Sequence, residues 1–328
     1  MNLKLINSSD HYPILNQARQ ARFQPPFIAQ LGIFILFFIL SQLISSFFMA
    51  IAIIPSMFQN MDAIVNSPPE AAYETMTLLM GNEIRLTMLF ATAATTLLCL
   101  LYCRLAEKRP FTSMGFIRPK AAMHYLAGLL AGGLMFLLTA LICLFTGSVR
   151  IEAVSGASLG FIFLFFLGFL VQGMSEEVMC RGYLMVSLTT RSPVLPAVIA
   201  NALIFSLMHF FNPNVTFLAL FNIFLFGVFC SFYMLYFNNI WGVCALHSAW
   251  NFVQGNILGS YVSGMDFKDS FFQMTPIAGY DRISGGSFGV EGGIAMTIVL
   301  GIGIVIFLLL LTRQLAARAG EPETASGI

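Results

Sequence analysis

The sequence predicts an all-α fold: a polytopic bundle of about eight transmembrane helices with both termini in the cytoplasm. Of the 328 residues, 58% are apolar and only 9% are charged, and the mean hydropathy is +0.84. A soluble domain carries roughly a quarter charged residues, so this composition argues against a soluble enzyme, a disordered chain or a coiled coil. The net charge of +1 supplies no basic surface, so no nucleic-acid partner is expected. The expected surroundings are a lipid bilayer.

Eight apolar segments approach the length of roughly 20 helical residues that crosses a bilayer. They are 27–54, 86–103, 121–146, 159–187, 194–211, 216–237, 240–258 and 292–311. The chain therefore divides into five regions. These are a polar cytoplasmic tail (1–26), N-terminal transmembrane helices (27–158), a transmembrane core (159–258), an extracytoplasmic loop (259–291), and the last transmembrane helix with a cytoplasmic tail (292–328). The first region lacks the apolar stretch of a signal peptide.

The orientation follows from the distribution of lysine and arginine. The segment 104–120 holds five basic residues against Glu107 alone, and Arg313 and Arg318 follow the last span. Because loops rich in lysine and arginine stay in the cytoplasm, both termini are expected inside. Acidic residues dominate the loops on the other side, among them Asp62, Glu70, Glu74, Glu83, Asp266, Asp269, Asp281 and Glu291.

Several small or sulfur-containing residues are expected to serve packing only. Gly128 and Gly132 form a G-x-x-x-G in the third span, a pattern typical of closely packed helices. The cysteines lie in apolar segments without a C-x-x-C pair, so we expect buried thiols rather than disulfides or a thiolate zinc site. They are Cys99, Cys103, Cys143, Cys180, Cys230 and Cys244. The glycine- and serine-rich stretch 284–287 could be a flexible lid or a linker, and the linker is favoured.

Ionisable side chains inside a membrane span are costly and mark function by default. The fourth span contains three of them, Glu176, Glu177 and Arg181. Glu177 and Arg181 are four residues apart, which suits an ion pair along one helix face. Glu176 points about 100° away from Glu177 and is left without a partner nearby in the sequence. An unpaired buried carboxylate suits a general acid or base, so Glu176 is the first catalytic candidate.

Two further spans contribute histidines. Phe205 and His209 share one face of the fifth span, and His247 and Asn251 share one face of the seventh. A single intramembrane histidine can be a packing residue. Two histidines together with adjacent carboxylates and an aligned asparagine indicate a functional site.

Helix geometry predicts that Glu176 and His209 lie at matching depth, where they could face each other. They lie at nearly equal distances along the chain from Pro193, in the turn between the fourth and fifth spans, which corresponds to roughly 25 Å of helix. His247 follows the turn at Asn239 more closely, so upright helices would leave it roughly 10 Å short of the depth of His209. A tilt, a kink or an irregular helix start is needed to close that gap.

A carboxylate and two histidines in an apolar cavity can activate water in two ways. In the first, Glu176 and His209 hold and deprotonate water directly. His247 and Asn251 then donate hydrogen bonds to the developing oxyanion. In the second, Glu176, His209 and His247 bind a divalent metal such as zinc, which lowers the pKa of bound water. Both routes yield amide hydrolysis, and the H-E-x-x-H pattern of zincins is absent.

Three motifs follow one another within the core 159–258: Glu176-Glu177-x-x-x-Arg181, Phe205-x-x-x-His209 and His247-x-x-x-Asn251. This ordered set resembles the motifs of the CPBP family, which comprises CAAX prenyl proteases and bacteriocin-processing enzymes and is also called the Abi family. The resemblance implies an eight-helix intramembrane endopeptidase, dependent on a glutamate or on a metal. It implies a catalytic centre of Glu176, His209, His247 and Asn251, with supporting roles for Glu177, Arg181 and Phe205.

The expected substrate is a peptide or protein at the membrane, either a prenylated CAAX tail or a bacteriocin-type peptide. The expected location is a bacterial cell membrane, and the sequence sets no oligomeric state. Two other functions would use the same residues. One is a non-catalytic scaffold or bacteriocin-immunity protein of the same fold, and the other is a transporter with a glutamate–histidine proton relay. No inverted repeat is recognised, which weighs against the transporter.

Overall fold

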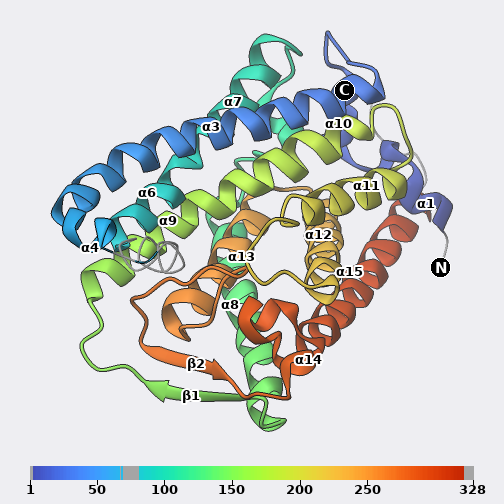
Figure 1. Ribbon diagram of the computed structural model, residues 1–328. Helices are drawn as coiled ribbons and strands as arrows, with labels where there is room; N and C mark the ends of the chain where they lie inside the picture. The colour runs from blue at the N-terminus through green and yellow to red at the C-terminus, as the bar shows by residue number, and fades with distance from the viewer. Residues whose placement is uncertain (1–2, 67, 69–80, 321–328) are drawn as a thin grey trace.

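The protein is mostly helical in the computed structural model, which describes residues 3–66, 68 and 81–320 (Figure 1). The predicted loop charges Glu70 and Glu74 and the last tail residues, 321–328, lie outside the described residues. The long helices are α3 (Phe27–Gln59), α6 (Asn82–Ala91) with α7 (Ala93–Leu105), α8 (Ala121–Phe145), α9 (Leu159–Glu177), α11 (Val194–Leu207), α12 (Phe217–Phe237), α13 (Trp241–Phe252) and α15 (Ile294–Gly320). Shorter helices outside the termini and the loop 259–291 include α4 (Met61–Val65) and η3 (Phe111–Met114).

Each predicted span corresponds to a helical segment. Among the described residues, 6 segments are long and apolar enough to cross a membrane. The chain is therefore an integral multi-pass membrane protein. Helices α11 and α13 are shorter, with 14 and 12 residues. The count of eight spans and the cytoplasmic position of both termini stay predictions.

Local sequence signals set the helix boundaries near the centre of the bundle. Ser158 and Thr216 begin α9 and α12, and each accepts an amide hydrogen bond from the first turn. Asn238 adopts a left-handed conformation with φ 49° and ends α12. After α9 the helix widens into a π-helical stretch, η4 (Val178–Met185), before the short α10 (Val186–Leu188). Such π-helical stretches occur frequently at functional sites.

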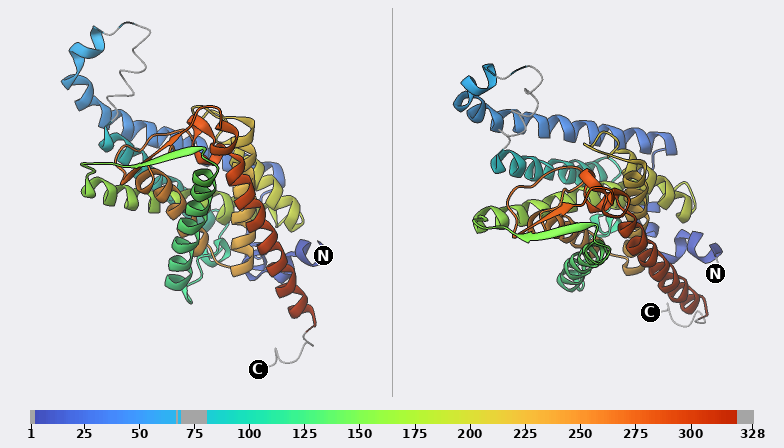
Figure 2. Two further views of the ribbon diagram at one scale, coloured as in Figure 1. Left: turned by 90° about the horizontal axis from the view of Figure 1, so that it is seen from below. Right: turned by 60° about the horizontal axis from the view of Figure 1, so that its bottom comes forward.

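Helix α13 lies between α9 and α8 in a stack that runs in the order α3, α6 with α7, α9, α13 and α8 (Figure 2). Its neighbours approach it through glycines. A Cβ atom at Gly128 or Gly132 of α8 would lie 2.0 Å from a backbone oxygen of α13. A Cβ at Gly173 of α9 would lie 2.7 Å from the amide nitrogen of Ser248. The close packing predicted from the G-x-x-x-G is confirmed, and its partner is α13.

A small antiparallel sheet, which the sequence analysis did not predict, joins two loops at one end of the bundle. Strand β1 (Val149–Ala153) pairs with β2 (Phe272–Pro276), with Val149 opposite Pro276. The all-α class therefore describes the membrane helices and not the whole chain. The pairing could not be read from the sequence because the two strands are far apart along the chain.

The loop 259–291 is folded rather than flexible. Besides β2 it contains α14 (Asp281–Ser284), η6 (Gly286–Phe288) and η7 (Val290–Gly292). The predicted linker at 284–287 is wrong, because Ser284 and Gly286 are buried. Gly285 and Gly286 have φ values of 80° and 56°, and these left-handed conformations turn the chain compactly against α15.

The region 1–26 is not a loose polar tail. It forms α1 (Leu3–Asn7), η1 (Ser9–His11) and α2 (Pro13–Arg19), and Ile6 and Ile14 are fully buried. The amide of Ile14 donates a hydrogen bond to Asn238 at the end of α12, and Arg318 of α15 donates one to the His11 carbonyl. Its apolar residues were too few to suggest a span, but they suffice to cover one end of the bundle.

The cysteines follow the prediction. All six are buried and free, so their role is packing in the apolar core. Trp250 of α13 and Tyr183 of η4 are among the largest fully buried side chains of that core.

Candidate active site

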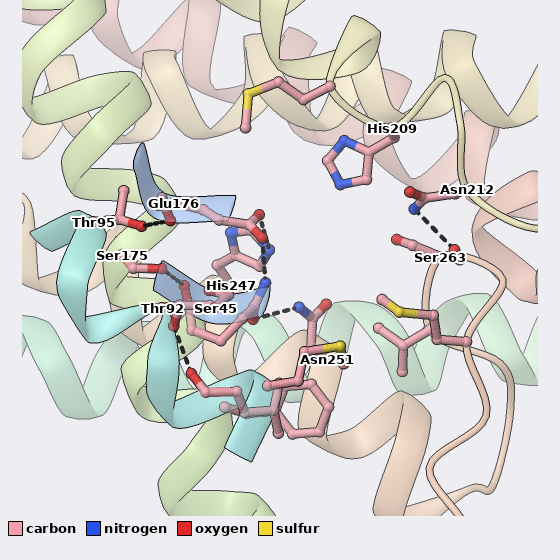
Figure 3. A pocket seen from close by; sticks show the side chains of 18 of the residues that line it. Ser45, Thr92, Thr95, Ser175, Glu176, His209, Asn212, His247, Asn251 and Ser263 are labelled. Carbon is pink, nitrogen blue, oxygen red and sulfur yellow. Dashed lines mark hydrogen bonds and ion pairs between the residues drawn. The ribbon is translucent and has the colours of Figure 1, made fainter. Parts of the chain in front are cut away.

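A cavity of about 320 Å³ lies inside the bundle beside the end of α9 (Figure 3). Its walls come from α3, α6, α7, α9 and α13, from the turn after α11 and from the loop 259–291. Methionine and phenylalanine side chains line much of it. Its polar lining includes Gln172, Glu176, His209, Asn212, His247, Asn251, Ser263 and Glu291. The four predicted catalytic side chains are therefore brought to one cavity.

Glu176 lies at the end of α9 with its side chain 21% exposed. The expectation that it lacks a partner nearby in the sequence is wrong. Gln172, one turn earlier, donates a hydrogen bond from Nε2 to Glu176 Oε1 at 2.6 Å. The other carboxylate oxygen, Oε2, has no hydrogen-bond partner among the described residues and lies 3.7 Å from His247 Nε2. Gln172 and Glu176 are four residues apart, which makes them neighbours on a helix, so this spacing could have predicted the hydrogen bond.

Glu177 is completely buried and holds two partners with one oxygen. Its Oε1 lies 2.9 Å from Arg181 Nη1 and 2.8 Å from His247 Nδ1. The predicted ion pair of Glu177 and Arg181 is confirmed. The Arg181 guanidinium also lies over the Phe205 ring, 4.4 Å from its centroid, in a cation–π contact. The three predicted supporting residues thus contact one another and His247.

The contact with Glu177 fixes the orientation of His247. An ionised carboxylate only accepts hydrogen bonds, so Nδ1 of His247 is the donor. Nε2 is then turned towards Glu176 and the cavity. A carboxylate behind a functional histidine commonly sets its tautomer and ring orientation in this way.

His209 enters the cavity from the side opposite Glu176 (Figure 3). It was expected within a helix, but α11 ends at Leu207, and His209 lies in the turn that follows. Its Nδ1 lies 2.9 Å from the carbonyl oxygen of Phe205. Because a carbonyl only accepts, Nδ1 carries the hydrogen, which leaves Nε2 of the neutral ring as an acceptor. The bond also satisfies a carbonyl at the end of the helix.

Asn251 is connected to Glu176 through Gln172. Its Nδ2 donates a hydrogen bond to Gln172 Oε1 at 3.0 Å, and Gln172 donates to Glu176. An amide NH₂ group has two hydrogens, so Asn251 keeps one for a ligand. This chain of bonds positions Asn251, Gln172 and Glu176 as one unit.

The depth gap expected for His247 does not separate it from His209 in the structure. The backbones of α9 and α13 come together one residue from His247, where a Cβ at Gly173 would lie 2.7 Å from the amide nitrogen of Ser248. The Phe205 ring lies 5.0 Å from His209 and 6.1 Å from His247, measured between ring centroids. Both histidines therefore lie beside the same ring.

Glu291 is a site residue that the sequence analysis missed, since it was counted as a loop charge. Its Oε2 accepts hydrogen bonds from the amide and the hydroxyl of Ser263, at 2.9 and 2.8 Å. Burial raises the pKa of the Glu291 carboxyl, and the bond from Ser263 and the nearby His209 oppose that rise. Only its position directly before the last span could have drawn attention to it.

The metal alternative requires three ligands close together. Within the described part of the chain, no three histidine, cysteine, aspartate or glutamate side chains form such a group. Glu176, His209 and His247 share the cavity, but His209 stands on the far side of it from the other two (Figure 3). The residues as arranged do not fit a bound metal ion.

Comparison with known protein families matches part of the chain. Residues 158–253 match the family described as type II CAAX prenyl endopeptidase Rce1-like. The resemblance inferred from the three motifs is thereby confirmed for this segment, which runs from the start of α9 to the end of α13 and contains the predicted residues. Comparison with curated proteins gives no match. Glu291 and Ser263 lie outside the matched segment.

Proposed function

We propose that this chain is an intramembrane endopeptidase that hydrolyses a peptide bond in the cavity beside Glu176. One observation carries the proposal: in a segment similar to CAAX prenyl endopeptidases, Glu176 Oε2 lies 3.7 Å from His247 Nε2 without another partner. A carboxylate and an imidazole at the edge of a cavity in a membrane protein have a high desolvation cost. That cost is consistent with a catalytic use.

In the proposed reaction, Glu176 and His209 hold a water molecule between them. As the water oxygen attacks the carbonyl carbon, Glu176 accepts its proton and later transfers it to the leaving amine. The acceptor at His209 Nε2 orients the water from the opposite side. No step requires a metal ion, and both carboxylate oxygens of Glu176 return to their starting state.

The oxyanion that forms needs hydrogen-bond donors. Asn251 has a second amide hydrogen free, and His247 donates from Nε2 when both of its ring nitrogens carry hydrogen. Gln172 and Glu177 hold these two donors in position. Preorganised donors of this kind accelerate a reaction because they do not have to reorient as charge develops.

The substrate class follows from the surroundings of the site. Methionine and phenylalanine side chains beside the polar residues suit an apolar group on the substrate. We therefore propose a membrane-associated peptide, with a prenylated CAAX tail or a bacteriocin-type peptide as the candidates.

The experiment uses the full chain in lipid nanodiscs and a farnesylated CAAX peptide with a fluorophore and a quencher on either side of the cleavage site. Wild type and Glu152→Gln, a control at an exposed carboxylate in β1, should cleave the peptide. Glu176→Gln should lose at least about 100-fold in kcat, with an unchanged melting temperature. Equal cleavage by Glu176→Gln would remove Glu176 from the mechanism. Binding without cleavage by the wild type would instead favour the non-catalytic scaffold.

A further inference from the structure

Glu291 is the second carboxylate of the cavity and is 7% exposed. Ser263 provides both hydrogen bonds to its Oε2, whereas no described residue donates to Oε1. One oxygen is therefore anchored in the wall, and the other is left for a ligand. A buried carboxylate oxygen without a hydrogen bond carries a free-energy cost of desolvation, which a bound partner that donates to it would offset.

Hydrogen bonds from α12 hold the backbone around Glu291 in place. Asn222 of α12, fully buried, donates hydrogen bonds to the carbonyls of Glu291 and Gly293 at 2.7 and 2.8 Å. Thr297 donates to the amide oxygen of Asn222 at 2.6 Å. Gly289 has a φ of 102°, and a Cβ there would lie 2.1 Å from the Tyr261 carbonyl oxygen. The carboxylate is therefore preorganised, which lowers the entropy cost of binding.

Next to Glu291, Ser263 uses both of its donors on Oε2, and its carbonyl accepts a hydrogen bond in turn. Asn212 donates its amide hydrogen to the Ser263 carbonyl at 3.0 Å, which leaves its Oδ1 free (Figure 3). Among the described residues that line the cavity, Glu176 and Glu291 are acidic and none is lysine or arginine. Arg181, the buried cation beside Phe205, is already paired with Glu177. Apart from the histidines, the described lining of the cavity therefore offers no basic side chain to Glu291.

We propose that Glu291 and Asn212 form a subsite for a basic side chain, lysine or arginine, close to the scissile bond of the substrate. The inference rests on the proposed function, because the cleaved peptide supplies the cation. A lysine ammonium or an arginine guanidinium can donate to Glu291 Oε1 and to Asn212 Oδ1 at once. Since Glu176 lies across the cavity, the basic residue and the reacting carbonyl would occupy opposite sides of it.

The test compares peptides that differ in one side chain. The residues of the farnesylated peptide on either side of the cleaved bond, except the farnesylated cysteine itself, carry lysine, norleucine or glutamate in turn. At one of these positions, the wild type should show a kcat/KM about 10- to 100-fold higher for lysine than for norleucine, the range that hydrogen bonds between charged groups provide. Glu291→Gln should reduce this ratio towards one, and Glu291→Lys should prefer the glutamate peptide. Glu152→Gln should keep the wild-type ratio.

Two outcomes would overturn the subsite. One is a wild type that does not distinguish lysine from norleucine at any position. The other is a Glu291→Gln variant that lowers kcat/KM for the lysine and norleucine peptides by the same factor. That result would mean that Glu291 interacts with His209 and not with the substrate. Binding of the same peptides to Glu176→Gln, measured by fluorescence anisotropy, tests the subsite without hydrolysis. A lysine preference in binding with no cleavage by the wild type would contradict the proposed function and leave the subsite supported.

Discussion

His247 Nδ1 lies 2.8 Å from Glu177 Oε1, and this contact makes one imidazole the link between two neighbouring carboxylates. Glu176 and Glu177 point about 100° apart on a helix, so a single partner for both is unusual. The ring of His247 serves both because each nitrogen addresses one of them, with Nε2 3.7 Å from Glu176 Oε2. Glu177 therefore orients the residue with which Glu176 is expected to act.

Replacing Arg181 by alanine should destabilise the protein strongly. Arg181 and Glu177 are both 0% exposed, and removal of one member of a buried ion pair leaves the other charge uncompensated, which costs about 3–5 kcal/mol. We expect a clearly lower melting temperature for Arg181→Ala in detergent, as measured by tryptophan fluorescence. The exposed Arg150→Ala in β1 is the matched control, and equal melting temperatures for both variants would contradict the structure.

Two adjacent glycines of α8 should respond differently to alanine. A Cβ at Gly132 would lie 2.0 Å from the Leu246 carbonyl oxygen, whereas one at Gly133 would lie 3.6 Å from a methyl group of Val253. Gly132→Ala must push α13 away and should lower the free energy of unfolding by about 1–3 kcal/mol or more. It should also lower kcat, because His247 directly follows Leu246. Gly133→Ala should keep or raise stability, since alanine favours a helix by about 1 kcal/mol over glycine. The reverse order would disprove the close contact of α8 and α13.

Gln172→Ala should lower kcat about 10-fold and leave KM nearly unchanged. Gln172 contacts both Glu176 and Asn251, and residues that orient functional groups typically contribute about 10- to 100-fold. Gln42→Ala provides the control, because Gln42 lines the same cavity from α3. If both variants raise KM alone, Gln172 binds the substrate and does not orient Glu176.

Chelation of metal ions should leave the activity in place. The candidate ligands Glu176, His209 and His247 do not form a three-ligand group among the described residues. We expect less than a twofold change in kcat after dialysis against 1,10-phenanthroline, relative to its non-chelating 1,7 isomer. Loss of activity that added zinc restores would instead establish the metal route.

The sequence alone determined the features that depend on local composition and spacing. Apolar length predicts the membrane helices because each span must satisfy its backbone hydrogen bonds internally. The four-residue spacing predicts the ion pair of Glu177 with Arg181, since such residues are neighbours on a helix. The glycine spacing predicts the close contact of Gly128 and Gly132 with another helix, although not which helix.

Only the tertiary structure decided the relationships between distant segments. The contact of His247 with Glu177 depends on the close approach of α9 and α13 at Gly173, which the depth estimate from upright helices could not include. Glu291 reaches the cavity because Asn222 and Ser263 hold its loop in place, and no local pattern encodes such bonds. The partners of a buried polar group are chosen by three-dimensional packing. The sequence could therefore identify costly buried groups, and the fold alone decided how they are paired.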